Sequence, residues 1–271
     1  MDKKTLIQNI KVRRSFLCVG LDSDLDKLPP HLDSSPNGVL QFNKEIIDAT
    51  AQYCVAYKLN TAFYEALGMY GWDVLAKTIE YIPKTHFIIA DAKRGDIGNT
   101  STMYAKAFFQ SLNADAVTVA PYMGEDSVKP FLAFKDKWTI LLALTSNEGS
   151  KDFQYIGKDQ DIPLYKKVIL KSLEWGTDEN LMFVLGATRV EQLKEVRSLV
   201  PHHFFLIPGV GAQGGSLKEV VTRTITKDIG ILVNSSREII YASNGIDFAE
   251  RAGMKAKEIS LSMAQLMDQL H

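Results

Sequence analysis

The sequence predicts an α/β protein, a single (β/α)8 barrel of the TIM type that forms one domain over residues 1–271. Eight short apolar segments recur along the chain, and segments with helical periodicity separate them. Polar side chains gather after the apolar segments rather than before them, and the carboxyl ends of the strands carry the chemistry in such barrels. The chain length of 271 residues is also usual for one barrel.

The predicted strands are continuous apolar runs, as expected for strands that are buried on both faces of a parallel sheet. They comprise residues 16–21, 55–60, 87–90, 116–120, 139–144, 181–185, 204–207 and 230–234. Helices are predicted over residues 39–52, 64–67, 72–81, 102–110, 127–134, 163–175, 189–200 and 248–270, and the apolar stripe is clearest in 39–52 and 189–200. A longer polar segment, residues 148–161, follows the fifth strand, and no repeat or domain boundary interrupts the pattern.

Composition and charge argue against several classes of function. The net charge of -1 provides no overall field for nucleic acid or an acidic membrane, so neither is expected as a partner. The amino-terminal segment has no apolar stretch typical of a signal peptide, and no segment is long enough to span a bilayer. Cys18 and Cys54 lie in or beside apolar runs, which favours buried thiols in a reducing compartment. We therefore expect a cytoplasmic protein.

The third strand leads into the most unusual segment of the chain. The apolar run ends at Ala90, where we expect the strand to stop, and Asp91, Lys93 and Asp96 follow within six residues. Strand alternation places Asp91 and Lys93 on one side, and Gly95 permits a turn that brings Asp96 beside them. A lysine between two carboxylates stays protonated, because negative neighbours favour its charged form. The cluster therefore suits a fixed acid, although a surface ion-pair network is the plainer alternative.

A helix is predicted to follow this cluster. Asn99, Thr100 and Ser101 are residue types that cap helices, so we expect them to precede a helix that begins at Thr102.

The connections after the seventh and eighth strands suggest a phosphate site, because barrels of this type often hold a phosphate there. Glycines at 209, 211, 214 and 215 allow close approach of backbone N–H groups, Gln213 adds a donor, and Arg237 adds a bidentate cation. The plainer alternative is a glycine-rich connection beside a surface arginine. Residues 209–214 also match G-x-G-x-x-G, but a dinucleotide fold carries that motif in its first unit rather than its seventh.

A metal site is not expected. The five histidines have no spacing typical of metal ligands. Asp22, Asp91 and Asp96 could hold magnesium, but the ammonium of Lys93 between the last two argues against it.

The segment Asp91-Ala92-Lys93-Arg94-Gly95-Asp96-Ile97 resembles the D-x-K-x-x-D-I signature of the orotidine 5'-phosphate decarboxylase family. The likeness extends over the whole chain in strand order and includes Asp22, Lys58, the run Pro208-Gly209-Val210, and Arg237. The long polar segment after Ser146 fits the longer, more divergent bacterial members.

The resemblance implies a cofactor-independent and metal-independent homodimer that decarboxylates orotidine 5'-monophosphate to uridine 5'-monophosphate, the last step of de novo pyrimidine synthesis. It implies that Asp22 and Lys58 contact ribose hydroxyls, that Asp91 lies near the leaving carboxylate, and that Lys93 protonates C6. Asp96 and Thr100 would reach the active site of the neighbouring subunit. Ser146 would contact the pyrimidine, with Thr145 as the alternative, and Pro208, Gln213 and Arg237 would line the phosphate site.

Two other functions remain open at this stage. A magnesium-dependent barrel decarboxylase or aldolase acting on a sugar phosphate, such as 3-keto-gulonate 6-phosphate decarboxylase, shares the D-x-K-x-x-D pattern. A barrel that binds a nucleotide without catalysis is the second.

Overall fold

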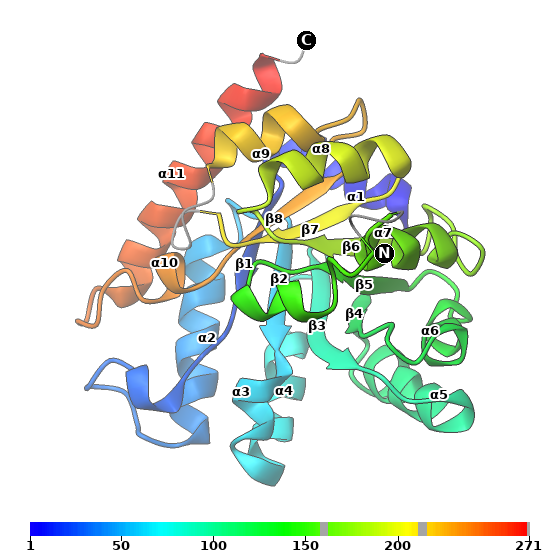
Figure 1. Cartoon of the computed structure of the whole chain (residues 1–271). Helices are drawn as coiled ribbons and strands as arrows, with labels where there is room; N and C mark the ends of the chain where they lie inside the picture. Colours follow the sequence, from blue (N-terminus) through cyan, green and yellow to red (C-terminus); the bar gives the residue numbers. More distant parts are fainter. Residues whose placement is uncertain (158–161, 211–215, 270–271) are drawn as a thin grey trace.

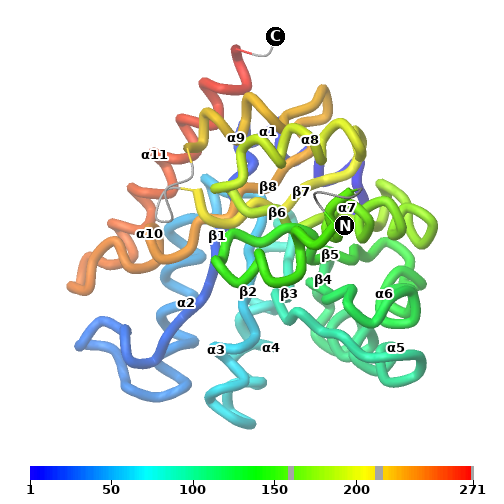
Figure 2. Tube along the Cα trace, viewed as in Figure 1, coloured from blue at the N-terminus to red at the C-terminus, as the bar shows by residue number. Residues whose placement is uncertain are grey.

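The computed structural model describes residues 1–157, 162–210 and 216–269 (Figure 2). Its centre is a closed barrel of eight parallel strands in chain order, in which β8 pairs with β1, so the predicted fold is confirmed (Figure 1). The strands are β1 (Leu17–Gly20), β2 (Ala56–Asn60), β3 (Phe87–Arg94), β4 (Ala116–Val119), β5 (Trp138–Leu144), β6 (Leu181–Leu185), β7 (Phe205–Pro208) and β8 (Ile231–Ser235).

Helices surround the barrel and cover the outer face of the sheet (Figure 1). The longer ones are α1 (Lys3–Arg13), α2 (Pro36–Thr50), α4 (Gly68–Tyr81), α5 (Gly98–Lys106), α6 (Glu125–Leu132), α7 (Leu164–Ser172), α8 (Val190–Leu199), α9 (Leu217–Thr224) and α11 (Phe248–Asp268). Shorter turns are η1 (Leu25–Lys27), α3 (Thr61–Glu65), the π-helical η2 (Ala107–Ser111), η3 (Glu148–Asp152) and α10 (Arg237–Ile240).

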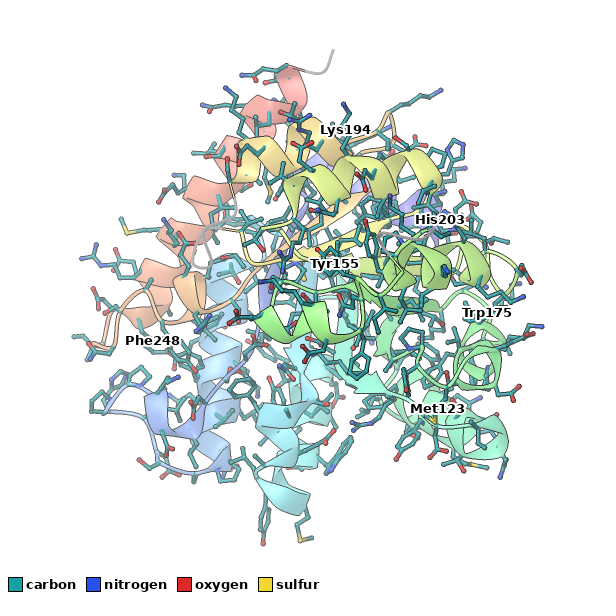
Figure 3. All side chains as sticks on the ribbon, viewed as in Figure 1. Met123, Tyr155, Trp175, Lys194, His203 and Phe248 are labelled. Atoms are coloured by element: carbon teal, nitrogen blue, oxygen red, sulfur yellow. The ribbon has the colours of Figure 1, made fainter. Side chains whose placement is uncertain are left out.

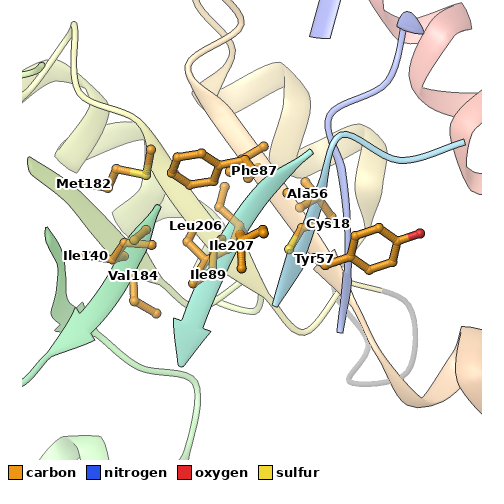
Figure 4. Packing of buried hydrophobic residues seen from close by; sticks show 14 of the residues in the cluster. Cys18, Ala56, Tyr57, Phe87, Ile89, Ile140, Met182, Val184, Leu206 and Ile207 are labelled. Carbon is orange, nitrogen blue, oxygen red and sulfur yellow. The ribbon is translucent and has the colours of Figure 1, made fainter. Parts of the chain in front are cut away.

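Side chains alternate between the barrel interior and the helix layer along each strand. On β2, Tyr57 points outward, where its hydroxyl contacts Thr50 of α2 at 2.8 Å, while Ala56 lies on the inner face (Figure 4). The same alternation turns Lys58 and Asn60 inward above Ala56. Apolar layers therefore fill the barrel below, and polar groups occupy its upper end.

Helices α1, α2 and α11 complete the packing. Asn9 of α1 donates to the carbonyl of Thr85, just before β3, so α1 lies at the amino-terminal ends of the strands. Phe42 of α2 stacks on Phe248 of α11 with ring centroids 5.1 Å apart. No helix in the three described ranges is long and apolar enough to cross a bilayer.

Several element boundaries differ from those predicted. Helices α1, α9 and α10 have no counterpart among the predicted helices. Strand β3 continues to Arg94 instead of ending at Ala90.

Both cysteines are buried and free, as predicted, and burial raises the pKa of the Cys54 thiol to about 12.

Candidate active site

A cavity of about 470 Å³ opens at the carboxyl ends of the strands. Leu142, Val184 and Leu206 provide apolar wall from β5, β6 and β7. Phe63, Pro208, Gly209 and Val210 also line the cavity, and the polar and charged lining residues are Asp22, Lys27, Lys58, Asn60, Asp91, Lys93, Thr145, Ser146, Asn147, Asn234, Ser235, Ser236, Arg237 and Tyr241. Four cations and two carboxylates are among these residues, so the described lining carries a net charge of +2 in a chain whose net charge is -1. The cavity therefore favours an anionic ligand.

Lys58 joins two carboxylates at the centre of this cavity. Its Nζ lies 3.0 Å from Oδ2 of Asp91 and 3.2 Å from Oδ1 of Asp22, and its side chain is 6% exposed. Burial alone would lower the pKa of Lys58, but Asp91 and Asp22 more than offset this effect and raise that pKa above the usual value. Lys58 is therefore a permanent cation, linking the ends of β1, β2 and β3.

Lys93 forms the second ion pair of Asp91. The Nζ of Lys93 lies 2.7 Å from Oδ1 of Asp91, and the Lys93 side chain is 46% exposed toward the cavity mouth. Burial would raise the pKa of Asp91, but Lys58 and Lys93 together hold that pKa well below its usual range. Asp91 is therefore ionised, and each of its two oxygens contacts one ammonium group.

Gly95 does not adopt a conformation that requires glycine. Gly95 does not have a positive φ, whereas Lys93 does, at 48°, and Gly98 does, at 51°. Lys93 itself has the left-handed backbone conformation, because β3 continues through the charged cluster and is irregular there.

Asp96 and Thr100 lie apart from this network. Asp96 accepts a hydrogen bond from the N–H of Ile97 and is absent from the described cavity lining, so the predicted placement of Asp96 beside Lys93 is wrong within one chain. The capping prediction is also wrong, because α5 begins at Gly98 and Thr100 lies exposed in its first turn. Neither side chain contributes to the cavity of its own chain.

Asp22 is also held by a residue that follows β8, the neighbour of β1 on the side away from β2. Ser236, which follows β8, donates to Oδ2 of Asp22 at 2.8 Å and to the carbonyl of Gly20 at 3.0 Å. A Cβ on Gly20 would lie 2.7 Å from Cβ of Ser236, so only glycine allows this approach. Both oxygens of Asp22 are therefore engaged, one by Lys58 and one by Ser236.

The segment after β5 brings Thr145, Ser146 and Asn147 to the cavity. The hydroxyl of Thr145 donates to Oδ1 of Asn147 at 2.5 Å and accepts from Nε2 of Gln154 at 2.8 Å. Gln154 also accepts from the N–H of Thr145 at 2.9 Å. Tyr155 follows on the same segment, in front of the barrel (Figure 3), and packs under the guanidinium of Arg189.

Residues after β7 and β8 line the same cavity. Pro208 ends β7, and Gly209 follows with a φ of 92°, a conformation that favours glycine. Arg237 begins α10 and is exposed at the cavity wall. Gln213, predicted to bind phosphate, lies outside the described residues, as do the glycines at 211, 214 and 215.

Several lining residues were missed by the sequence reasoning. Asn60, Asn147, Asn234 and Ser236 all stand at or just after strand ends, so the rule that selected Asp22 could have found them. Lys27 lies in η1, away from any strand end, and carried no local signal.

The described residues offer no group of three His, Cys, Asp or Glu side chains that could hold a metal ion. Asp22 and Asp91 lie close together, and the ammonium of Lys58 lies between their carboxylates. The prediction had placed Lys93 between two carboxylates instead. An ammonium in that position disfavours a divalent cation.

Comparisons with known proteins agree with this geometry. Residues 15–252 match the model of the orotidine 5'-phosphate decarboxylase / HUMPS family. Orotidine 5'-phosphate decarboxylase of Christiangramia forsetii is 59% identical over 273 residues, with all of both chains covered. The protein of the same name from Flavobacterium johnsoniae is 55% identical over 271 residues and 99% of both chains. A solved structure of Leishmania donovani OMP decarboxylase is 35% identical, with a TM-score of 0.81 over 96% of this chain and 99% of that one. The chain belongs to the orotidine 5'-phosphate decarboxylase family.

Proposed function

We infer that the chain is the enzyme that decarboxylates orotidine 5'-monophosphate to uridine 5'-monophosphate and CO2, the last step of de novo pyrimidine synthesis. The observation that carries this inference is the chain of ion pairs Asp22–Lys58–Asp91–Lys93 in a cavity lined with net positive charge. Asp91 and Lys93 belong to the family signature, Asp22 and Lys58 belong to the wider likeness, and relatives of the same length carry that activity in their names.

We propose that Lys93 is the proton donor. When the bond between C6 and the carboxylate breaks, its electron pair stays on C6, and CO2 leaves. A fixed ammonium in a site of low dielectric stabilises this developing charge more strongly than water does. The Nζ–H bond of Lys93 then breaks, its proton goes to C6, and the lysine regains a proton from solvent.

Asp91 has a supporting part in this proposal. Its two oxygens hold the ammonium groups of Lys58 and Lys93, so the position of the acid depends on Asp91. Asp91 would also face the leaving carboxylate of the substrate.

The remaining lining residues suit the rest of the nucleotide. Asp22 and Lys58 would contact ribose hydroxyls, Gln213 and Arg237 would hold the phosphate, and Pro208 would line the phosphate site. We assign the pyrimidine contact to Ser146, which lines the cavity beside Thr145, with Thr145 as the alternative. Binding energy from the distant phosphate can then be used to stabilise the transition state.

We further propose a homodimer in which Asp96 and Thr100 enter the partner's active site. Both residues lie outside their own cavity, and exposed apolar side chains flank them. These side chains are Ile97 and Met103, which are near in the chain, and Met123, which lies next to Gly95. Apolar patches of this kind mark interfaces between proteins.

The two free thiols support a location in the reducing cytoplasm.

The test is a spectrophotometric assay with orotidine 5'-monophosphate, run with and without a chelator. Loss of substrate absorbance that survives the chelator is expected. Absence of turnover would refute the decarboxylase assignment and leave a nucleotide-binding barrel. Turnover abolished by the chelator would favour the magnesium-dependent sugar-phosphate enzymes of the alternative reading.

A further inference from the structure

We propose that Thr118 of β4 is a positioning residue that fixes both the main chain and the side chain of Lys93. This inference rests on the role of Lys93 given under the proposed function. It starts from an irregularity in the barrel rather than from the family signature.

Strand β3 is bulged where it meets Thr118. Ala90 pairs with Val117 and Arg94 pairs with Val119, so three residues of β3 lie opposite the single residue Thr118. Extra residues in a bulge lose their regular partners in the strand ladder. Bulges that stand beside an active site typically redirect a side chain.

Lys93 occupies the end of this bulge with a φ of 48°. The left-handed region is unfavourable for a residue with a side chain, and it persists only where the surroundings hold it. The N–H of Lys93 therefore needs a partner other than a β4 carbonyl. It donates to Oγ1 of Thr118 at 2.9 Å.

The Thr118 hydroxyl completes a closed ring of hydrogen bonds. Oγ1 accepts from the Lys93 N–H and donates to Oδ1 of Asp91 at 2.8 Å. The same Oδ1 accepts from Nζ of Lys93 at 2.7 Å. The ring thus begins at the main chain of Lys93, passes through Thr118 and Asp91, and returns to the ammonium of the same lysine.

Burial makes the hydroxyl hard to replace by water. Thr118 is 0% exposed, and Asp91 is 9% exposed. Without the hydroxyl, the Lys93 N–H and one oxygen of Asp91 would each lose a partner in a site with little access to water. The ammonium would then shift, and a displacement of about 1 Å at a reacting group costs on the order of 100-fold in rate.

Two comparisons test the assignment: Thr118→Val against the wild-type protein, and Thr118→Ser against Thr118→Ala. Thr118→Val removes the hydroxyl at nearly constant shape, while Thr118→Ser and Thr118→Ala differ from each other in the hydroxyl alone. Thr139→Val is the matched control, because Thr139 is buried on β5 and its Oγ1 has no partner among the described residues. The measurements are kcat and KM for orotidine 5'-monophosphate, affinity for uridine 5'-monophosphate, and hydrogen exchange of the Lys93 amide.

We expect kcat to fall about 10- to 100-fold in the valine and alanine variants, because the acid is displaced, while KM changes by less than about threefold. The serine variant should restore kcat, and Thr139→Val should leave it unchanged. The Lys93 amide should exchange faster in Thr118→Val than in the wild-type protein.

The inference is overturned if Thr118→Val retains kcat, if serine is as impaired as alanine, or if the Lys93 amide exchanges at the wild-type rate in Thr118→Val. Lack of turnover by the wild-type enzyme would instead refute the proposed function. The amide exchange measurement would still decide the role of Thr118 in that case, because it needs no substrate.

Discussion

Oδ1 of Asp91 accepts the ammonium of Lys93 at 2.7 Å, while Oδ2 of the same carboxylate accepts the ammonium of Lys58 at 3.0 Å. The two cations differ in exposure, since the side chain of Lys58 is 6% exposed and that of Lys93 is 46% exposed. One carboxylate therefore holds a buried cation in place and presents a second cation to the cavity. This division of roles underlies the first prediction.

Replacement of Lys93 by alanine should lower kcat by several orders of magnitude, because it removes both the charge that stabilises the carbanion and the proton that quenches it. Binding of uridine 5'-monophosphate, measured by calorimetry, should survive. Lys77→Ala, which removes an exposed lysine paired with Asp73 on α4, is the control. Near-normal turnover by the Lys93 variant would contradict the assignment of the acid.

Replacement of Arg237 by alanine should weaken binding of uridine 5'-monophosphate by about 10- to 100-fold, since a charge-assisted hydrogen bond to an anion contributes about 1.5–3 kcal/mol. The affinity for uridine, which lacks the phosphate, should be the same in both proteins. Calorimetry with the two ligands separates these effects. An equal loss for uridine would show that Arg237 does not act through the phosphate.

A mixing experiment tests the predicted dimer. Lys93→Ala and Asp96→Ala should each be nearly inactive, but a hybrid dimer would contain one site with an intact lysine and an intact partner aspartate. After unfolding and refolding an equal mixture, roughly a quarter of the wild-type activity should return, because a symmetric interface pairs the two chains at random. Activity no higher than that of the separate variants would argue that Asp96 does not act across an interface.

Among the arginines, Arg197 should be the one whose substitution lowers the free energy of unfolding most. It is buried, it donates to the carbonyls of Thr224, Val200, His203 and Gly230, and its guanidinium lies 3.6 Å from the ring centroid of Phe205. Lysine cannot reach all four acceptors, so Arg197→Lys should lower the free energy of unfolding by about 2–4 kcal/mol.

Urea denaturation measures this loss, and Arg223→Lys serves as control, because the half-buried side chain of Arg223 forms a surface ion pair with the exposed Glu191. The kcat of folded Arg197→Lys should match the wild-type value, because these carbonyls lie away from the cavity lining. Equal stability of the two variants would disprove the role of Arg197.

His203 should make the fold sensitive to mild acid. Burial lowers the pKa of His203 to about 4, an effect that Lys3 and Arg197 strengthen and Asp178 opposes. Neither ring nitrogen has a hydrogen-bond partner among the described residues. Below its ordinary pKa of about 6.5, the unfolded chain binds a proton that the folded chain rejects, so stability falls as the pH drops from about 6.5 to about 4.

The loss attributable to His203 should reach about 2 kcal/mol at a pH of about 5. His203→Phe, which keeps a ring against Phe183, should flatten this dependence in urea titrations at neutral and acid pH. His202→Gln, a change at the exposed neighbouring histidine, should not. Identical acid sensitivity of the two variants would exclude His203 as the cause.

Local sequence patterns were sufficient for the barrel and for much of its site. Runs of four to six mainly apolar residues mark each strand, and the polar residues at or after their ends include Asp22, Lys58, Asp91, Lys93 and Arg237, all of which line the cavity. Both features depend on near neighbours in the chain, because strand alternation and burial are local constraints.

Only the closed barrel decided which of these groups meet. Thr118 and Asp91 are 27 positions apart, and Ser236 and Asp22 are 214 positions apart, yet both pairs are in hydrogen-bond contact. The sequence also placed Asp96 beside Lys93, whereas the irregular end of β3 and the start of α5 at Gly98 keep Asp96 out of the cavity of its own chain. Contacts of this kind follow from the register between strands and from the pairing of β8 with β1, which no local pattern encodes.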